Sequence, residues 1–185
     1  MRIIAGKYGK LRLATLNSRL TRPTSDKVKE SLFDSLGQFF NGGQVLDLYA
    51  GSGALGLEAV SRGFDHATLV DISGQACRII KKNIEATRHP ENFTLLRMPD
   101  QKAIQLLSKQ QKQFDLIFLD PPYAKQKIVK VMQKMLAEGL VAAGGLVVAE
   151  TDAGTDLGEV AGYQLLKTHT LGRTTVRFYQ KEGAA

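Results

Sequence analysis

The sequence is poor in the residues that build disulfides and metal sites. Cys77 is the only cysteine among 185 residues, which excludes an intramolecular disulfide and a zinc site made of cysteines. The three histidines, His66, His89 and His169, are scattered along the chain with no second ligand at metal-binding spacing. We therefore expect no metal. We also expect Cys77 to be an inert core residue, because apolar residues surround it in a predicted helix.

The sequence also lacks long apolar runs. No run approaches the ~20 residues that a membrane-spanning helix needs. The N-terminal stretch MRIIAGK is interrupted by polar groups too soon to form a secretory signal. With a hydrophobic share of 43% and a charged share of 23%, the 185 residues fit one globular domain. We expect a cytoplasmic protein without a membrane partner.

Positive charge is concentrated near the N-terminus. Of the formal net charge of +7, residues 1–30 carry +6, and the remaining 155 residues carry +1. Such asymmetry favours a polyanionic partner, because a basic segment that neutralises phosphates releases their counterions. The alternative is a solvated basic arm that only aids solubility.

The hydrophobic pattern predicts an N-terminal arm followed by an α/β domain. Residues 1–20 alternate loosely around turn glycines, which is typical of a β-hairpin or extended arm. The domain, residues 21–185, opens on an amphipathic helix that includes Phe39 and is expected to end at Gly42–Gly43. Strands are then expected over 45–49, 67–71, 93–96, 114–119, 145–150, 163–171 and 174–180, with a helix after each of the first four. This alternation predicts a Rossmann-like, mostly parallel sheet with helices on both faces and an antiparallel final strand.

The best-defined motif is a glycine-rich turn between the first strand and the helix after it. Gly51, Gly53 and Gly56 match the G-x-G-x-x-G pattern, and Asp71 ends the next strand 20 residues after Gly51. That spacing is typical of a carboxylate that accepts hydrogen bonds from ribose hydroxyls. Glycines in such a turn let the backbone approach a ligand closely. The motif predicts a nucleoside site, and the alternative is a tight turn without a ligand.

Acidic residues near the turn indicate which nucleoside binds. The carboxylate of Asp47 would repel the pyrophosphate of a dinucleotide, which argues against a nicotinamide-dependent oxidoreductase. It could instead bind the amino group of S-adenosylmethionine, which has no phosphate and carries a cationic sulfonium. Asp100, after the third strand, is placed to bind the adenine amino group, or equally to cap the helix that follows.

The tetrapeptide Asp120-Pro121-Pro122-Tyr123 follows the fourth strand, at the edge where open α/β sheets bind ligands. An exocyclic base amine is a poor nucleophile because its lone pair is delocalised into the ring. The Asp120 carboxylate and the Pro121 carbonyl could accept its two N–H groups and hold the nitrogen in line with a methyl donor. The two prolines stiffen the loop, and Tyr123 offers a face on which an extruded base can stack. The alternative is a stiff strand-to-helix loop without a catalytic role.

Four segments together resemble the RsmD family of bacterial methyltransferases, which modify guanine N2 in 16S ribosomal RNA. These segments are Arg2–Gly6, Thr21–Thr24, Leu46–Ala59 and Asp120–Tyr123, and the resemblance extends from the first residues to Tyr179. It implies a seven-stranded class I methyltransferase fold that uses S-adenosylmethionine and acts on the small ribosomal subunit. The oligomeric state is open from the sequence, and we expect a monomer because a small methyltransferase with a basic arm can work as one. The implied cofactor-binding residues are Asp47, Gly51, Ser52, Gly53, Asp71, Ile72 and Asp100. The implied RNA-binding residues are Arg2, Lys7, Lys10, Arg12 and Arg22.

Two other functions remain open from the sequence. The tetrapeptide also occurs in adenine-N6 methyltransferases of DNA, although the chain has no obvious added region for reading base edges. A non-catalytic RNA-binding assembly factor would keep the fold, but it would not need the intact tetrapeptide or Asp71.

Overall fold

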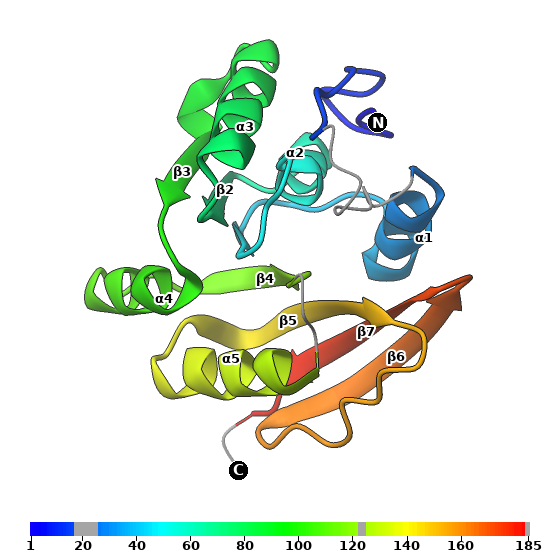
Figure 1. Cartoon of the computed structure of the whole chain (residues 1–185), viewed down its shortest axis with the longest axis vertical. Helices are drawn as coiled ribbons and strands as arrows, with labels where there is room; N and C mark the ends of the chain where they lie inside the picture. The colour runs from blue at the N-terminus through cyan, green and yellow to red at the C-terminus, as the bar shows by residue number, and fades with distance from the viewer. Residues whose placement is uncertain (17–25, 122–124, 184–185) are drawn as a thin grey trace. The chain divides into compact units, whose positions relative to one another are not determined.

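A computed structural model describes residues 1–16, 26–121 and 125–183. The helices within these residues are α1 (Asp26–Leu36), α2 (Ala54–Ser61), α3 (Gly74–Ala86), α4 (Asp100–Lys109), α5 (Lys125–Ala137) and the short 3-10 helix η1 (Pro90–Asn92). The strands are β1 (Gln44–Asp47), β2 (His66–Asp71), β3 (Phe93–Arg97), β4 (Phe114–Leu119), β5 (Val141–Asp152), β6 (Tyr163–Leu171) and β7 (Thr174–Lys181). Their order in a seven-stranded sheet is β3-β2-β1-β4-β5-β7-β6, which confirms the expected α/β class (Figure 1).

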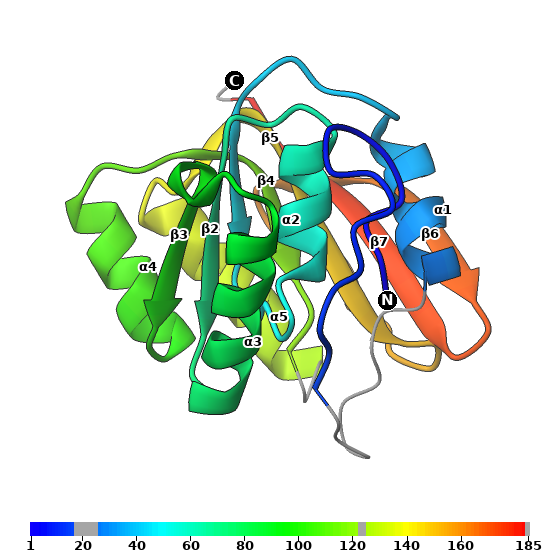
Figure 2. The same ribbon diagram turned by 90° about the horizontal axis from the view of Figure 1, so that it is seen from above.

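The described chain divides into two compact units, Met1–Asp100 and Gln101–Ala185. In the first unit, β2 pairs in parallel with both β1 and β3. Helices α2 and α3 cover the same face of these strands (Figure 2). The contact between α2 and β2 is close, because a Cβ added at Gly56 would lie 2.2 Å from a methyl group of Leu69. The third glycine of the motif is therefore required for helix–strand packing.

Helix α2 has no solvent-facing side, because all eight of its residues are buried. An apolar helix of this kind needs cover on every face. The N-terminal segment lies along α2 and supplies part of that cover (Figures 1 and 2). It buries the side chains of Ile3, Tyr8 and Leu13, and an antiparallel bridge joins Arg2 to Arg12. The predicted boundary at residue 20 lies outside the described residues.

In the second unit, β4 and β5 pair in parallel, and β7 pairs antiparallel with both β5 and β6. β6 and β7 form the expected closing pair. Helix α5 packs against β5, and the Tyr163 hydroxyl at the start of β6 donates a hydrogen bond of 2.9 Å to the Met132 carbonyl of this helix. The parallel strands bring the loop after β4 and the end of β5 to the same edge of the sheet.

The predicted end of the first helix was wrong. Helix α1 ends at Leu36 rather than near Gly42, because Gly37 has a φ of +124° and leaves the helical region. Phe39, which was expected on the apolar face of that helix, is consequently 66% exposed. Cys77 is buried on α3, as expected. Among the described helices, none is both long and apolar enough to cross a membrane.

Candidate functional site

The glycine turn between β1 and α2 has the geometry that its sequence predicts. Gly51 and Gly53 have φ angles of +56° and +78°, which favour glycine, and the Gly53 N–H donates to the Ala50 carbonyl at 2.6 Å. A Cβ added at Gly51 would meet no atom within 4 Å, so this part of the turn borders open space. The turn can therefore accept a ligand close to its backbone.

Asp71 at the end of β2 holds this turn in place. One of its carboxylate oxygens accepts a hydrogen bond from the Gly51 N–H at 2.9 Å, and the other accepts from the Ser73 N–H at 2.8 Å. Because a carboxylate can accept about four hydrogen bonds, capacity remains for two ribose hydroxyls. The adjacent Ile72 side chain is 66% exposed, which is unusual for a large apolar residue. Free acceptors next to an exposed apolar surface suit a nucleoside.

Asp47 occupies the end of β1 and is 4% exposed. Its carboxylate accepts a hydrogen bond from the Gly56 N–H in the first turn of α2, at 3.2 Å. An acceptor therefore already occupies this helix N-terminus, where a pyrophosphate would bind in a dinucleotide enzyme. In addition, residues 44–61 contain no lysine or arginine that could neutralise a phosphate. Both observations favour a ligand without phosphate groups, such as S-adenosylmethionine.

Asp100 is the first residue of α4. It accepts a hydrogen bond of 2.7 Å from the Tyr49 hydroxyl, which follows β1. Burial, and then this hydrogen bond, raise the pKa of Tyr49 above its ordinary value, so the hydroxyl stays protonated as a donor. The geometry brings Asp100 to the carboxyl ends of β1 and β3, and its predicted contact with adenine stays a prediction.

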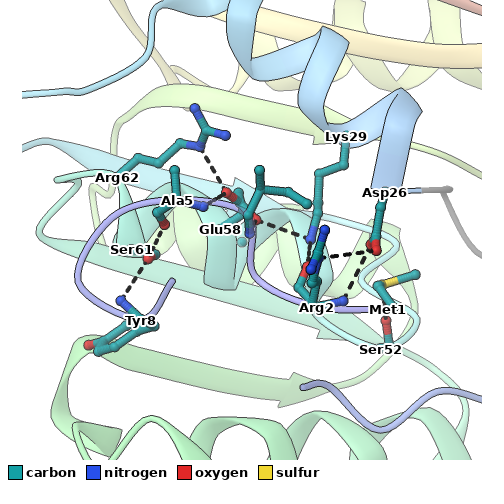
Figure 3. A network of polar contacts seen from close by, with 12 residues as sticks. Met1, Arg2, Ala5, Tyr8, Asp26, Lys29, Ser52, Glu58, Ser61 and Arg62 are labelled. Carbon is teal, nitrogen blue, oxygen red and sulfur yellow. Dashed lines mark hydrogen bonds and ion pairs between the residues drawn. The ribbon is translucent and has the colours of Figure 1, made fainter. Parts of the chain in front are cut away.

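The N-terminal segment is fixed to α2 by a buried carboxylate, Glu58 (Figure 3). Glu58 accepts hydrogen bonds from the Ile4 and Ala5 N–H groups at 2.8 and 3.1 Å. It also forms ion pairs with Lys29 at 3.0 Å and with Arg62 at 2.8 Å. The side chains of Lys29 and Glu58 are 0% exposed and that of Arg62 is 3% exposed, so all three charges are withdrawn from solvent.

A second buried side chain, Asn83 of α3, joins the same segment to the glycine turn. Its amide accepts from the Ala14 N–H at 2.8 Å and donates to the Ala14 carbonyl at 3.0 Å. The same amide donates to the Ser52 carbonyl within the turn at 2.9 Å. The Ser52 hydroxyl in turn contacts the Met1 sulfur at 3.8 Å. The basic segment and the candidate cofactor turn are thus parts of one hydrogen-bonded structure.

The predicted RNA-binding residues of the arm are exposed where the structure describes them: Arg2, Lys7, Lys10 and Arg12. Arg2 forms a surface ion pair with Asp26 at 3.8 Å. Arg22 lies outside the described residues. Lys29 belongs to the same basic stretch of sequence, but its burial against Glu58 removes it from any RNA-facing surface. Burial lowers the pKa of Lys29, and Glu58 opposes that shift.

The tetrapeptide is described up to its first proline. Asp120 directly follows the buried strand β4 and is exposed, whereas Pro121 is buried. Although water reaches Asp120, desolvation by the surrounding protein, followed by the charge of Asp152, raises its pKa to about 6. Pro122 and Tyr123 lie outside the described residues. Sequence reasoning did not find Glu58 or Asn83, because their backbone partners in the N-terminal segment are more than 50 positions away. Arg62 was missed although it pairs with Glu58 at i,i+4 spacing, because such a pair on a helix usually lies on the solvated face.

A family model described as conserved hypothetical protein 95 matches residues 1–180. The chain belongs to this family. It is 38% identical over 184 residues to a candidate rRNA methyltransferase of Bacillus subtilis, YlbH, covering 99% of this chain and 100% of that protein. It is 32% identical over 183 residues to ribosomal RNA small subunit methyltransferase D of Escherichia coli K12, covering 98% of this chain and 90% of the relative.

A solved structure at similar sequence identity has the same fold as this chain. A candidate methyltransferase from Escherichia coli, yhhF, superposes with a TM-score of 0.84 at 31% identity and covers 98% of both chains. The predicted resemblance to the RsmD family is therefore confirmed over nearly the full length. In the part of the chain that the structure describes, no group of three or more metal-binding side chains could hold an ion.

Proposed function

We propose that the chain moves the methyl group of S-adenosylmethionine to the exocyclic N2 amine of a guanine in 16S rRNA of the small ribosomal subunit. Full-length similarity to proteins named ribosomal RNA small subunit methyltransferase D supports the substrate class. The observation that carries the chemistry is Asp120, an exposed carboxylate at the end of a buried strand, followed by a buried proline.

The residues around the glycine turn would hold the cofactor. S-adenosylmethionine, when bound, supplies an electrophilic methyl group. We assign the ribose hydroxyls to the free acceptor capacity of Asp71 and the adenine face to the exposed Ile72. The further residues that we assign to cofactor binding are Asp47, Gly51, Ser52, Gly53 and Asp100.

Asp120 and the Pro121 carbonyl would orient the acceptor amine. Two acceptors on the N–H groups of the amine favour a more tetrahedral nitrogen and aim its lone pair at the methyl carbon. These residues would therefore act mainly by positioning the amine. The nitrogen then bonds to the methyl carbon, the carbon–sulfur bond breaks with its electron pair on sulfur, and the nitrogen loses one proton to solvent. We assign base stacking to Tyr123, and RNA backbone contacts to the exposed arm residues Lys7, Lys10 and Arg12.

Methyl transfer from tritiated S-adenosylmethionine to three acceptors tests this proposal: unmodified small ribosomal subunits, naked 16S rRNA and genomic DNA. Label recovered as N2-methylguanosine is the expected result. Label on DNA alone, recovered as N6-methyladenine, would replace the proposal with a DNA methyltransferase. Removal of the arm charges should weaken RNA binding without changing the identity of the product.

Asp120→Ala tests the division of roles within the site. We expect methyl transfer to fall by at least about 100-fold, because the amine loses a positioned acceptor. Affinity for S-adenosylhomocysteine, measured by calorimetry, should stay within about twofold, since the cofactor residues lie elsewhere. Asp115→Ala is a matched control, because Asp115 is an exposed carboxylate on the same strand. Abolished cofactor binding in Asp120→Ala, or unchanged transfer, would contradict the assignment.

A further inference from the structure

The end of β5 places two acidic side chains next to Asp120. Leu119 pairs with Ala149 in the parallel ladder between β4 and β5, so one step further along each strand sets Asp120 beside Glu150. Neighbouring strands lie about 4.8 Å apart, and residues at matching positions direct their side chains to the same face. Asp152 lies two residues beyond Glu150 on β5 and shares that face.

Glu150 is less accessible than either of its acidic neighbours. Asp120 and Asp152 are exposed, whereas Glu150 is only partly exposed and its Oε2 atom is fully buried. Within the described part of the chain, this oxygen has no hydrogen-bond partner. A buried, ionised carboxylate oxygen without a donor is unfavourable by several kcal/mol, whereas a protonated carboxyl can act as a donor itself.

On the strand β7, no positive charge lies opposite these two acidic residues of β5. β7 places Val176 opposite Glu150 and Thr174 opposite Asp152, and neither side chain is charged. Arg177 pairs with Ala149 instead, so it projects to the other face of the sheet, where it donates to the Thr151 hydroxyl at 3.0 Å. The charged groups that face Glu150 from these strands are therefore the two aspartates.

We infer that Glu150 shares a proton with Asp120 and acts as a positioning residue, holding the Asp120 carboxylate in the orientation that receives the acceptor amine. The inference deepens the proposed function and rests on it, because it gives Asp120 the role of amine acceptor. A protonated Glu150 donates to one Asp120 oxygen and leaves the other free. The pair then carries one negative charge in place of two, as in other closely spaced carboxyl pairs.

The pKa shifts that burial and charge produce in this cluster agree with its geometry. Desolvation, followed by the charge of Asp120, raises the pKa of Glu150 to about 8. The pKa of Asp120 is raised to about 6, but there the acidic neighbour that acts is Asp152 rather than Glu150. The difference has a simple reason. Around pH 6, Glu150 has the higher pKa, is still protonated and therefore exerts no charge on Asp120.

The sign of the pH dependence follows from these two ionisations. Below the pKa of Asp120 its carboxylate becomes protonated and loses acceptor strength, so methyl transfer should fall on the acid side. Above the pKa of Glu150 the pair carries two charges, Asp120 loses its donor, and transfer should fall on the alkaline side. The wild-type profile of kcat against pH is therefore expected to be bell-shaped.

Glu150→Gln separates the shared proton from a merely structural role. The amide keeps the shape and a hydrogen-bond donor but cannot ionise, so kcat near neutral pH should stay within about fivefold while the alkaline fall disappears. Glu150→Ala removes the donor and should lower kcat at least tenfold, with KM for S-adenosylmethionine unchanged. Glu159→Gln makes the same chemical change at an exposed site of the same unit and should keep the wild-type profile. An alkaline fall that persists in Glu150→Gln would overturn the inference.

Carbon-13 NMR of glutamate side-chain carboxyl groups tests the shared proton without any methyl acceptor. The Glu150 signal, identified by its absence in Glu150→Gln, should titrate above pH 7 and should move to lower pH in Asp120→Asn. Titration of Glu150 near pH 4–5, the ordinary range for glutamate, would overturn the inference alone. Failure of the wild-type protein to methylate any acceptor would overturn the proposed function instead, and the two failures are therefore distinguishable.

Discussion

Replacing Glu58 by glutamine tests how the N-terminal arm is held on the protein. In the native structure, the Glu58 carboxylate accepts two backbone N–H groups and neutralises the buried charges of Lys29 and Arg62. Lys29 also donates to the Arg2 carbonyl, so the same cation links the arm to α1. Glutamine has nearly the same shape, but it has no charge, and one of its two polar atoms is a donor that faces other donors.

The expected effect is large because both cations stay buried without their counter-ion. Removing one partner of a buried ion pair costs about 3–5 kcal/mol, which is a substantial part of the ~5–15 kcal/mol that stabilises a typical domain. For a chain of this length, each kcal/mol lowers the Tm by about 2–4 °C, so a decrease of roughly 6–20 °C is expected. The unfavourable donor–donor contact of the glutamine amide acts in the same direction.

Thermal and urea unfolding of Glu58→Gln would measure this effect. Asp26→Asn is a matched control, because Asp26 also binds the arm through Arg2, but as an exposed pair at 3.8 Å that should contribute at most about 1 kcal/mol. Trypsin should cleave after Lys7 and Lys10 in Glu58→Gln at temperatures where the wild-type arm is protected. A decrease in stability below about 1 kcal/mol, equal to that of the control, would refute the reasoning.

Two further predictions concern the links from the arm to the cofactor turn and to RNA. Asn83→Ala removes three hydrogen bonds, one of them to the Ser52 carbonyl. The free energy of unfolding should fall by about 1–3 kcal/mol. Calorimetry should also show weaker binding of S-adenosylhomocysteine. Unchanged ligand affinity would show that the turn keeps its shape without this link. Exchanging Lys10 and Arg12 for glutamine should weaken the salt dependence of RNA binding. The slope of log K against the logarithm of the salt concentration should become less negative by about one unit for each phosphate that is no longer neutralised. The same exchange at the exposed Lys102 should leave that slope unchanged, and equal effects would refute specific binding of RNA by the arm.

Much of the fold could be predicted because its signals are local. The strand β1, the glycine turn and Asp71 are separated by short, characteristic distances along the chain, so one stretch of sequence contains the whole pattern. The limits of β5 were harder to find, since the structure extends this strand to Val141–Asp152 from a prediction of 145–150. Residues 142–145 are two alanines and two glycines, which have low strand propensity. They lie where the register between β4 and β5 shifts, between the pairs Phe114–Val141 and Leu116–Leu146, so no regular strand pattern marks them in the sequence.

The interactions that organise the candidate site could not be predicted from local patterns. Asn83 binds Ala14 across 69 positions, and the N–H groups of the arm reach Glu58 across more than 50. Lys29 illustrates the problem best, because its charge counts toward the basic N-terminal stretch although the side chain is buried. Composition can report the sign and place of a charge excess, but only the tertiary structure shows which charges remain available to a partner.

The same interactions explain why a basic arm and a cofactor turn would occur together in one small protein. Helix α2 begins at the glycine turn, and the Glu58 carboxylate near its middle holds the arm. Asn83 then joins the end of the arm directly to Ser52 in the turn. A force applied to the arm by bound RNA would therefore act on the backbone that borders the cofactor site. If cofactor binding stiffens that backbone and so favours RNA binding, RNA binds more tightly to the cofactor-loaded protein. By linkage, bound RNA then raises the affinity for the cofactor by the same factor. Equal RNA affinity with and without S-adenosylhomocysteine would show that these hydrogen bonds join the two elements structurally without coupling their binding.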